Sequence, residues 1–282
     1  PKDTSKYGEH RRYKEPVGVL HRPRPERPRA DQPAQTIEAD VVVVGAGTGG
    51  WFAACSAAEE GVYVVLLEKT EGGANVRGDL GAVNSRYQQE DGCQIDEQGI
   101  LFDLYRVSNG YISYALHRTW YQNSGATVDW YGDRLADHDV ALWHELATEQ
   151  PDRVPLVSHW PVGHSPAWPK DENGLETLTG KDVLEAYFTE LGGEVLYNTV
   201  MVKLDRDGDR VGGVWATNAD GETVLVHAAR GVVVATGGYG KNAAMMDALQ
   251  PETQALYSLN IARPGCTGDG IKACLWAGAA MD

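Results

Sequence analysis

The sequence is poor in cysteine, and its cysteines do not form a metal or redox motif. There are four among 282 residues: Cys55, Cys93, Cys266 and Cys274. No two of them make a C-x-x-C pair, so the chain by itself gives no support for structural zinc, an iron–sulfur cluster or a thioredoxin-type site. We expect free thiols and no bound metal.

The sequence also lacks a long apolar run and an excess of positive charge. No stretch approaches the roughly 18 apolar residues of a membrane-spanning helix, so we expect a soluble chain without a transmembrane segment. The formal net charge is -15, whereas nucleic-acid-binding proteins are usually basic, so we expect no nucleic-acid partner. A small anionic substrate still fits a locally positive site. Because the first residue is Pro1 and not Met, both a cytoplasmic location and export after leader removal stay open.

Residues 1–35 differ in composition from the rest of the chain. They contain nine Lys or Arg against five Asp or Glu, and prolines stand at positions 23, 25, 28 and 33. We interpret this segment as an extended, basic, proline-rich arm, either lying on the surface or on a partner, or forming a solvated tail. Residues 36–282 are then expected to form the folded domain.

The folded part opens with a strand, a glycine turn and a helix. Residues 40–44, Asp-Val-Val-Val-Val, are typical of a buried parallel strand, and residues 62–67 are typical of a second one. Between them lie the glycine turn that starts at Gly45 and a predicted helix over 48–60. This is a βαβ unit, which predicts an α/β fold of the Rossmann type with a central parallel sheet.

The rest of the pattern predicts more helices and a group of strands. Predicted helices cover 100–121, 124–149 and 175–191, with two shorter ones that begin near Lys241 and Gly270. A loop is expected over 151–174, rich in Pro, Gly, His and Trp. Predicted strands cover 194–204, 211–217, 222–228 and 231–235. Asp220-Gly221 is a hairpin signal, so we expect a β-hairpin or meander layer beside the central sheet.

The glycine turn matches the pattern G-x-G-x-x-G at Gly45, Gly47 and Gly50. Gly45 permits the tight turn, Gly47 lets the backbone approach a pyrophosphate, and Gly50 lets the helix pack against the strand. The N-terminus of the following helix offers free N–H groups to phosphate. With a strand before it and a helix after it, the motif predicts a dinucleotide site.

Glu68 ends the second strand, 23 residues after Gly45. A carboxylate there accepts hydrogen bonds from the ribose hydroxyls of an adenosine and repels a 2′-phosphate, which disfavours NADP. The fingerprint alone does not separate NAD from FAD. Further glycine-rich segments do so: Glu68–Asn75, Gly81–Asn84, Ala235–Gly238 and Thr267–Gly270.

Taken in this order, the segments resemble the FAD domain of the fumarate reductase and succinate dehydrogenase flavoprotein family, which includes soluble fumarate reductases, urocanate reductases and 3-ketosteroid dehydrogenases. The resemblance covers about residues 38–282. It implies an FAD cofactor and assigns roles to the matching positions. The pyrophosphate would lie on Gly45, Ala46, Gly47, Gly49 and Gly50. The adenosine ribose would bind Glu68, with Lys69 beside it.

The resemblance implies further cofactor contacts along the chain. The diphosphate and ribityl region would be wrapped by Gly73, Ala74 and Asn75. The isoalloxazine would lie along Leu80, Gly81 and Ala82. The adenine would meet the backbone of Val200. The adenosine and diphosphate side would be lined by Ala235, Thr236, Gly237 and Gly238. The ribityl chain would lie near Asp269.

The sequence departs from the family pattern at two positions expected near the flavin, so the resemblance supports the contacts to the adenosine better than those to the flavin. Val76 stands where the family often has Ser or Thr, and Gly81-Ala82 stands where it usually has two glycines. Asn75 occupies the position of the histidine that bonds covalently to FAD in membrane-bound members. Because asparagine cannot form that bond, we expect non-covalent FAD.

Other candidate groups give weaker predictions. His144-Glu145 fails as a metalloprotease motif because Thr148 stands where the second histidine is needed. Arg263, just before the Thr267–Gly270 segment, either meets a phosphate or substrate carboxylate or makes a structural ion pair. Structural or solvated roles are expected for His138, His159 and His164. Pocket lining or simple packing is expected for Trp160 and Trp168.

In the family, hydride passes between flavin N5 and an activated carbon–carbon double bond, and the catalytic acid and substrate-binding residues follow the Thr-Gly-Asp-Gly helix. No residue here matches the acid, so the catalytic residue is unknown and the cap domain is expected to be missing. We expect a second polypeptide or a continuation to complete a hetero-oligomeric or longer enzyme, with a haem or flavin module as electron donor. A flavoprotein oxidase of another reaction type and a non-catalytic FAD-binding subunit are the alternatives.

Overall fold

The computed structural model describes residues 33–108, 110, 112–145, 160–252, 262–263 and 265–281. The chain divides into two compact units. The sheet unit comprises the described residues of Pro1–Ala74 and Phe188–Asp282, and the helical unit comprises those of Asn75–Tyr187. The predicted arm lies almost wholly outside the described residues, so it stays a prediction.

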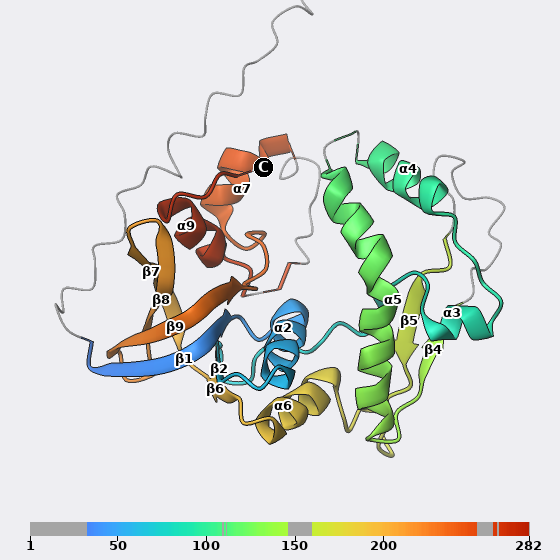
Figure 1. Ribbon diagram of the computed structural model, residues 1–282, viewed down its shortest axis with the longest axis horizontal. Helices are drawn as coiled ribbons and strands as arrows, with labels where there is room; N and C mark the ends of the chain where they lie inside the picture. The colour runs from blue at the N-terminus through green and yellow to red at the C-terminus, as the bar shows by residue number, and fades with distance from the viewer. Residues whose placement is uncertain are drawn as a thin grey trace, which may run out of the picture. The chain divides into compact units, whose positions relative to one another are not determined.

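The sheet unit is built on one six-stranded sheet in the order β6-β2-β1-β9-β8-β7. The long neighbouring strands β1 and β9 run side by side at its centre (Figure 1). The four strands β6, β2, β1 and β9 are parallel, and β8 and β7 continue the sheet antiparallel. The strands are β1 (Gln35–Val44), β2 (Val64–Leu67), β6 (Glu194–Leu196), β7 (Val200–Asp207), β8 (Arg210–Thr217) and β9 (Thr223–Val234). The helices are α2 (Thr48–Glu59), α7 (Ala243–Leu249) and α9 (Asp269–Trp276).

Both faces of β2 and of the last three residues of β1 are buried, which is why these stretches are continuous apolar runs. Val42 and Val44 belong to a core cluster that also contains Ala273 of α9. Because side chains alternate along a strand, Val43 points to the opposite face. Helix α2 packs against β1 and β2, and its Trp51 is fully buried. The glycine motifs follow the carboxyl ends of β1, β2 and β9. This is the edge at which parallel sheets bind ligands.

The predicted α/β class with a central parallel sheet and an added hairpin is confirmed. The β8–β9 hairpin turns at Asn218–Glu222, where Gly221 has a positive φ of 79°. Some of the predicted strand limits are wrong: the strand predicted over 40–44 begins at Gln35, the strand predicted over 194–204 is divided between β6 and β7, and 222–228 and 231–235 form the single strand β9. Its first half pairs with β8 and its whole length pairs with β1, so the glycine at 231 interrupts the sequence pattern without ending the strand.

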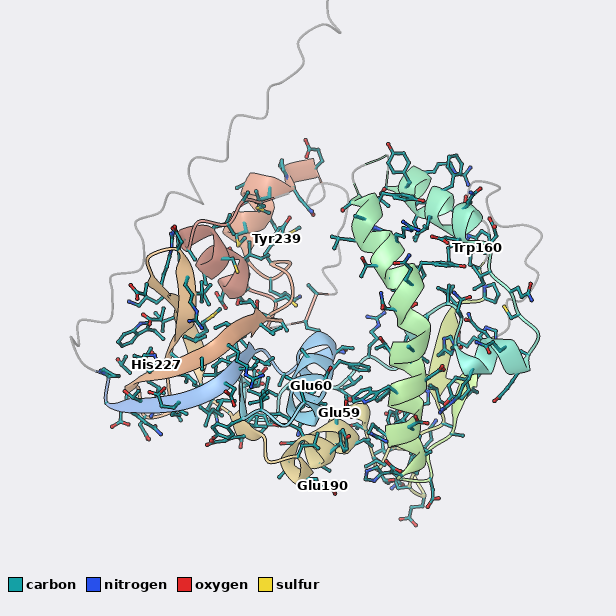
Figure 2. The ribbon with its side chains drawn as sticks, in the orientation of Figure 1. Glu59, Glu60, Trp160, Glu190, His227 and Tyr239 are labelled. Carbon is teal, nitrogen blue, oxygen red and sulfur yellow. The ribbon has the colours of Figure 1, made fainter. Side chains whose placement is uncertain are left out.

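The helical unit has a small antiparallel sheet in the order β3-β5-β4. Its strands are β3 (Leu80–Gly81), β4 (Leu142–His144) and β5 (Gly163–Pro166). Its helices are α3 (Arg86–Glu90), α4 (Glu97–Val107), α5 (Tyr114–Ala136) and most of α6 (Gly180–Glu190). Ser85 and Gln88 form a capping box at α3, and Asp96 caps α4. Trp160 lies beside α4 (Figure 2), donates to Asp103 Oδ2 at 3.1 Å and packs against Gly99.

The predicted helices 100–121 and 124–149 are wrong in their limits. The chain leaves the helix after Val107, and Gly110, at a φ of 80°, donates its N–H to Tyr105 O at 3.0 Å. This is a left-handed stop of the kind glycine provides. Helix α5 runs without interruption through the predicted break and ends at Ala136. The predicted loop contains β5 in its described part, and residues 146–159 lie outside the described ranges.

The described helices include none that is both long enough and apolar enough to cross a membrane.

Candidate functional site

The turn between β1 and α2 is closed by two glycines that no other residue can replace without movement. Gly45 has a φ of 101°, and a Cβ on it would lie 2.7 Å from the carbonyl oxygen of Ala235. A Cβ on Gly50 would lie 1.7 Å from the carbonyl oxygen of Gly45. These contacts bring the start of α2, the end of β1 and the end of β9 together. They are the packing roles that the motif predicts for these two glycines.

The other two glycines of the turn face open space. A Cβ on Gly47 or on Gly49 would meet no atom within 4 Å. Gly47 is the N-cap of α2, and no side chain caps this helix end. The N-terminal end of α2 therefore lies beside an open backbone surface. This cradle fits an anionic diphosphate, because the helix end supplies both donors and partial positive charge.

Glu68, at the end of β2, is only 8% exposed, and its carboxylate is held by its own chain. Oε2 accepts the N–H of Ala46 at 2.9 Å. Oε1 accepts the N–H and the hydroxyl of Thr70 at 2.9 and 2.7 Å. A carboxylate has about four acceptor positions, so these bonds leave Oε2 with an acceptor position for a ligand hydroxyl. The residue therefore fits the ribose-binding role predicted for it.

A second glycine turn follows Glu68 and is joined to the first. Gly73 has a φ of 68° and donates its N–H to Thr70 Oγ1 at 3.0 Å. Ala74 donates its N–H to the carbonyl oxygen of Ala46 at 3.3 Å. On the other side, Thr199 donates its N–H to Glu68 O at 2.9 Å, which places Val200 at the start of β7 beside this segment.

A third segment completes this edge of the sheet. Ala235 donates its N–H to Val44 O at 2.8 Å, and Gly268 donates its N–H to Gly238 O at 3.1 Å. A Cβ on Gly270 would lie 2.0 Å from Thr236 Oγ1. Tyr239, which follows the turn near α7 (Figure 2), packs against Gly268. The segments around Ala235–Gly238 and the start of α9 are therefore packed directly on one another.

Asp269, the first residue of α9, forms an ionic group with Lys69, from a distant part of the sequence, and with Lys272 of the same helix. Lys69 Nζ lies 3.1 Å from Asp269 Oδ2 and 2.9 Å from Thr267 Oγ1. Lys272 Nζ lies 3.0 Å from Asp269 Oδ1. Burial raises the pKa of the Asp269 carboxyl, but hydrogen bonds from Thr267, Lys272 and Lys69 outweigh it and lower the pKa from 3.8 to about 2. The carboxylate is therefore ionised at neutral pH.

The sheet unit brings most of the predicted cofactor residues to one edge of its sheet. They are Gly45, Ala46, Gly47, Gly49, Gly50, Glu68, Lys69, Gly73, Ala74, Val200, Ala235, Thr236, Gly237, Gly238 and Asp269. The remaining predicted positions belong to the helical unit: Asn75, Leu80, Gly81 and Ala82. There, Asn75 Oδ1 accepts the N–H of Lys181 at 3.3 Å, and Gly81 O accepts the indole N–H of Trp120 at 3.0 Å.

Arg263 is exposed, and within the described ranges it has no ion-pair partner. The structural ion pair considered from the sequence is thus not seen among those residues. Three residues to which the sequence argument assigned no contact also belong to the site: Thr70, Thr267 and Lys272. A threonine that precedes a glycine of positive φ by three residues is a local turn signal. Of the three residues, Thr70 is therefore the one that the sequence could have indicated.

The described residues contain no group of three or more His, Cys, Asp or Glu side chains arranged to hold a metal. His144 Nδ1 lies 2.8 Å from Asp91 Oδ2, and His164 Nε2 lies 2.7 Å from Ser85 Oγ. Burial lowers the pKa of the fully buried His164 imidazole. These histidines join segments of the helical unit. His159 lies outside the described residues.

A pocket of about 330 Å³ opens where β9 ends beside α9. Apolar side chains dominate its lining: Val234, Ile271, Cys274, Leu275 and Met281.

Comparison with known proteins identifies the family of the chain. The model of the FAD binding domain family matches residues 40–282. NADH:fumarate oxidoreductase of Klebsiella pneumoniae is 28% identical, with 82% of this chain and 24% of that protein covered. Vinyl phenol reductase of Lactiplantibacillus plantarum is also 28% identical, with 85% and 46% covered. The chain thus spans a quarter to a half of the length of these curated relatives.

The fold is shared with solved structures. The 3-ketosteroid-Δ4-(5α)-dehydrogenase of Rhodococcus jostii RHA1 superposes with a TM-score of 0.69 at 24% identity, over 89% of this chain and 56% of that one. The resemblance inferred from the glycine segments is confirmed, and the matched family agrees with the predicted FAD cofactor. The chain belongs to the FAD binding domain family.

Proposed function

We propose that this chain is the FAD-binding component of a flavoenzyme that reduces, or in reverse desaturates, an activated carbon–carbon double bond of a small organic molecule. The observation that carries the proposal is the cradle of the sheet unit. Two glycine turns surround the buried Glu68, and the uncapped N-terminus of α2 opens beside them. The relatives named as fumarate and vinyl phenol reductases support the reaction class.

Each part of the cradle has a task toward FAD. The N–H groups at the start of α2 and the open backbone at Gly47 would hold the diphosphate. Glu68 would hold the adenosine ribose and exclude a nucleotide that carries a 2′-phosphate. Lys69, Thr267 and Lys272 would keep Asp269 ionised and fixed at the start of α9. Bound FAD would supply hydride transfer at N5, and the chain binds and orients it.

The FAD is proposed to bind without a covalent bond. Asn75 carries an amide, which is not a nucleophile, and its side-chain oxygen accepts a hydrogen bond from the backbone of Lys181. Arg263, exposed and without an ion-pair partner among the described residues, is proposed to meet a phosphate or a substrate carboxylate. A guanidinium can bind either group through two parallel hydrogen bonds.

The catalytic acid is proposed to come from further polypeptide, either a continuation or a second chain. Strand β9 supports this, because β8 pairs with it only over Thr223–His227. Over 230–234 the edge opposite β1 has no neighbouring strand within the described ranges, and Val233 is 39% exposed there. An unpaired edge with an apolar side chain is a site for another strand. The pocket beside α9 lies at the same strand end.

The proposed function is tested by reduction and reoxidation of the flavin. The purified protein is loaded with FAD and reduced with dithionite, and its reoxidation is then followed after addition of fumarate, acrylate, urocanate or a vinyl phenol. The proposal predicts FAD uptake by the chain alone and rapid reoxidation by one acceptor class only after a partner is added. Uptake of FAD with rapid reoxidation by dioxygen alone would favour an oxidase.

A further inference from the structure

We propose that Thr70 is a positioning residue that orients the Glu68 carboxylate and braces the two glycine turns against each other. The inference rests on the proposed FAD-binding function and adds to it a residue that the glycine fingerprint does not include. Thr70 stands two residues after Glu68, in the segment that leads into the second glycine turn.

The directions of the hydrogen bonds at Thr70 are fixed by chemistry. A hydroxyl has one hydrogen to donate and two lone pairs to accept with. The N–H of Gly73 can only donate, so Thr70 Oγ1 accepts it at 3.0 Å. The single hydroxyl hydrogen then goes to Glu68 Oε1 at 2.7 Å. The result is a directed chain from the Gly73 N–H through the Thr70 hydroxyl to the Glu68 carboxylate.

This chain continues into the first glycine turn. Glu68 Oε2 accepts the N–H of Ala46 at 2.9 Å, and Ala46 O accepts the N–H of Ala74 at 3.3 Å. The bonds form a closed circuit that joins the turn after β1 to the turn after β2. Because bonds to a carboxylate are stronger than neutral ones and linked bonds polarise one another, the hydroxyl stiffens both turns together.

The hydroxyl also decides which carboxylate oxygen is left for a ligand. Thr70 supplies both donors to Oε1, its own N–H and its O–H, so Oε1 is satisfied within the chain. Oε2 has one internal donor only, the N–H of Ala46. Without the hydroxyl, the carboxylate would keep only the two backbone N–H bonds, from Ala46 and Thr70. It would be held less firmly, and a ribose would have to complete its ordering on binding. The expected penalty therefore falls on ligands that carry the adenosine ribose.

The alternative role for Thr70 is local closure of its own turn, with no effect on Glu68. The test uses apo-protein of four variants: Thr70→Val, which is isosteric without the hydroxyl, Thr70→Ala, Thr70→Ser, which keeps the hydroxyl, and Thr36→Val as a control at an exposed position of β1. FAD affinity is measured by quenching of flavin fluorescence, and ADP affinity by competition against FAD. ADP keeps the ribose and the diphosphate but lacks the flavin.

Thr70→Val and Thr70→Ala are expected to weaken FAD binding about tenfold, because each removes one hydrogen bond to a carboxylate. ADP is expected to weaken by the same factor, while Thr70→Ser and Thr36→Val stay within about twofold of the parent protein. In a Glu68→Gln background the added effect of Thr70→Val is expected to shrink to about twofold or less, because the two groups act as one unit.

The proposal is overturned by unchanged FAD affinity in Thr70→Val, by Thr70→Ser behaving like Thr70→Val, or by a loss for FAD without a loss for ADP. Full additivity with Glu68→Gln would also reject it and leave local turn closure as the role. Failure of the parent protein to bind FAD at all is a different result, since it would reject the proposed function itself.

Discussion

The glycines of the first turn allow effects on stability to be separated from effects on FAD binding. Two of them pack against backbone atoms, and the other two face open space. We predict that Gly50→Ala destabilises the protein and that Gly47→Ala does not, although both lie in the same motif. A Cβ on Gly50 would lie 1.7 Å from Gly45 O, whereas a Cβ on Gly47 would meet no atom within 4 Å. Gly47 has a φ of -92° and a ψ of -170°, which any residue can adopt.

The magnitudes follow from these contacts. Overpacking that forces backbone to move costs about 3 kcal/mol or more, which corresponds to a fall in Tm of roughly 6–12 °C for a domain of this size. For Gly47→Ala, the weaker N-cap and the smaller entropy of the unfolded chain offset each other to within about 1 kcal/mol. Its Cβ would instead keep a diphosphate from the backbone, and losing two charge-assisted hydrogen bonds weakens FAD binding about a hundredfold or more.

The assay is thermal unfolding of the apo-proteins together with FAD titration. Gly49→Ala serves as a companion for Gly47→Ala, because its Cβ is equally unobstructed. The reasoning is refuted if Gly47→Ala unfolds at as low a temperature as Gly50→Ala, or if Gly47→Ala binds FAD as tightly as the parent protein.

Three other predictions concern single side chains. Because the folded-state pKa of Asp269 lies at about 2, below its ordinary 3.8, its contribution to stability is present above pH 3.8 and is lost as pH falls toward 2. Urea unfolding at several pH values should show this loss, and Asp269→Asn should flatten it; equal slopes would contradict the ionic group. Acid precipitation of the FAD-loaded protein should leave all flavin in the supernatant, since Asn75 forms no covalent bond, and a yellow pellet would contradict this. Arg263→Ala should keep the unfolding temperature within about 2 °C and raise the Kd for FAD or, in the completed enzyme, the KM for substrate; unchanged values of both would assign Arg263 no role in the site.

The order of the first βαβ unit and the limits of its helix could be predicted closely because their signals are local, whereas β1 begins at Gln35, five residues before the predicted strand. Buried parallel strands are continuous valine and leucine runs, and the glycines that bound them are required by backbone geometry. Glu68 was found by its distance along the chain from Gly45, and its burial and hydrogen bonds agree with the role expected of it.

The helical unit was predicted less well, for reasons that particular residues show. Helix α4 ends after Val107, and Gly110 follows with a positive φ and a hydrogen bond back to Tyr105 O. The apolar spacing on both sides of Gly110 is helical, so the pattern alone does not show that the helix ends there. The strand at Leu142–His144 has only three residues and exists because β5 pairs with it. Such short strands are set by tertiary pairing, which overrides local propensity.

Contacts between distant segments could not be predicted from one sequence at all. Lys69 and Asp269 are brought together only by the order of the sheet, and no local pattern in either segment indicates the other. The bond from Thr70 to Glu68 is local, but its importance depends on Gly73 and Ala46 completing the circuit. The glycine fingerprint therefore locates the site, and the packed structure shows how its parts are held.

The most direct test of the account is equilibrium binding of FAD to the purified apo-protein, with Glu68→Gln measured beside it. The account predicts a yellow complex that takes up one FAD per chain, is displaced by ADP and is weakened by the substitution at Glu68. A folded protein that stays colourless after FAD is added, or whose flavin is not displaced by ADP, would contradict it.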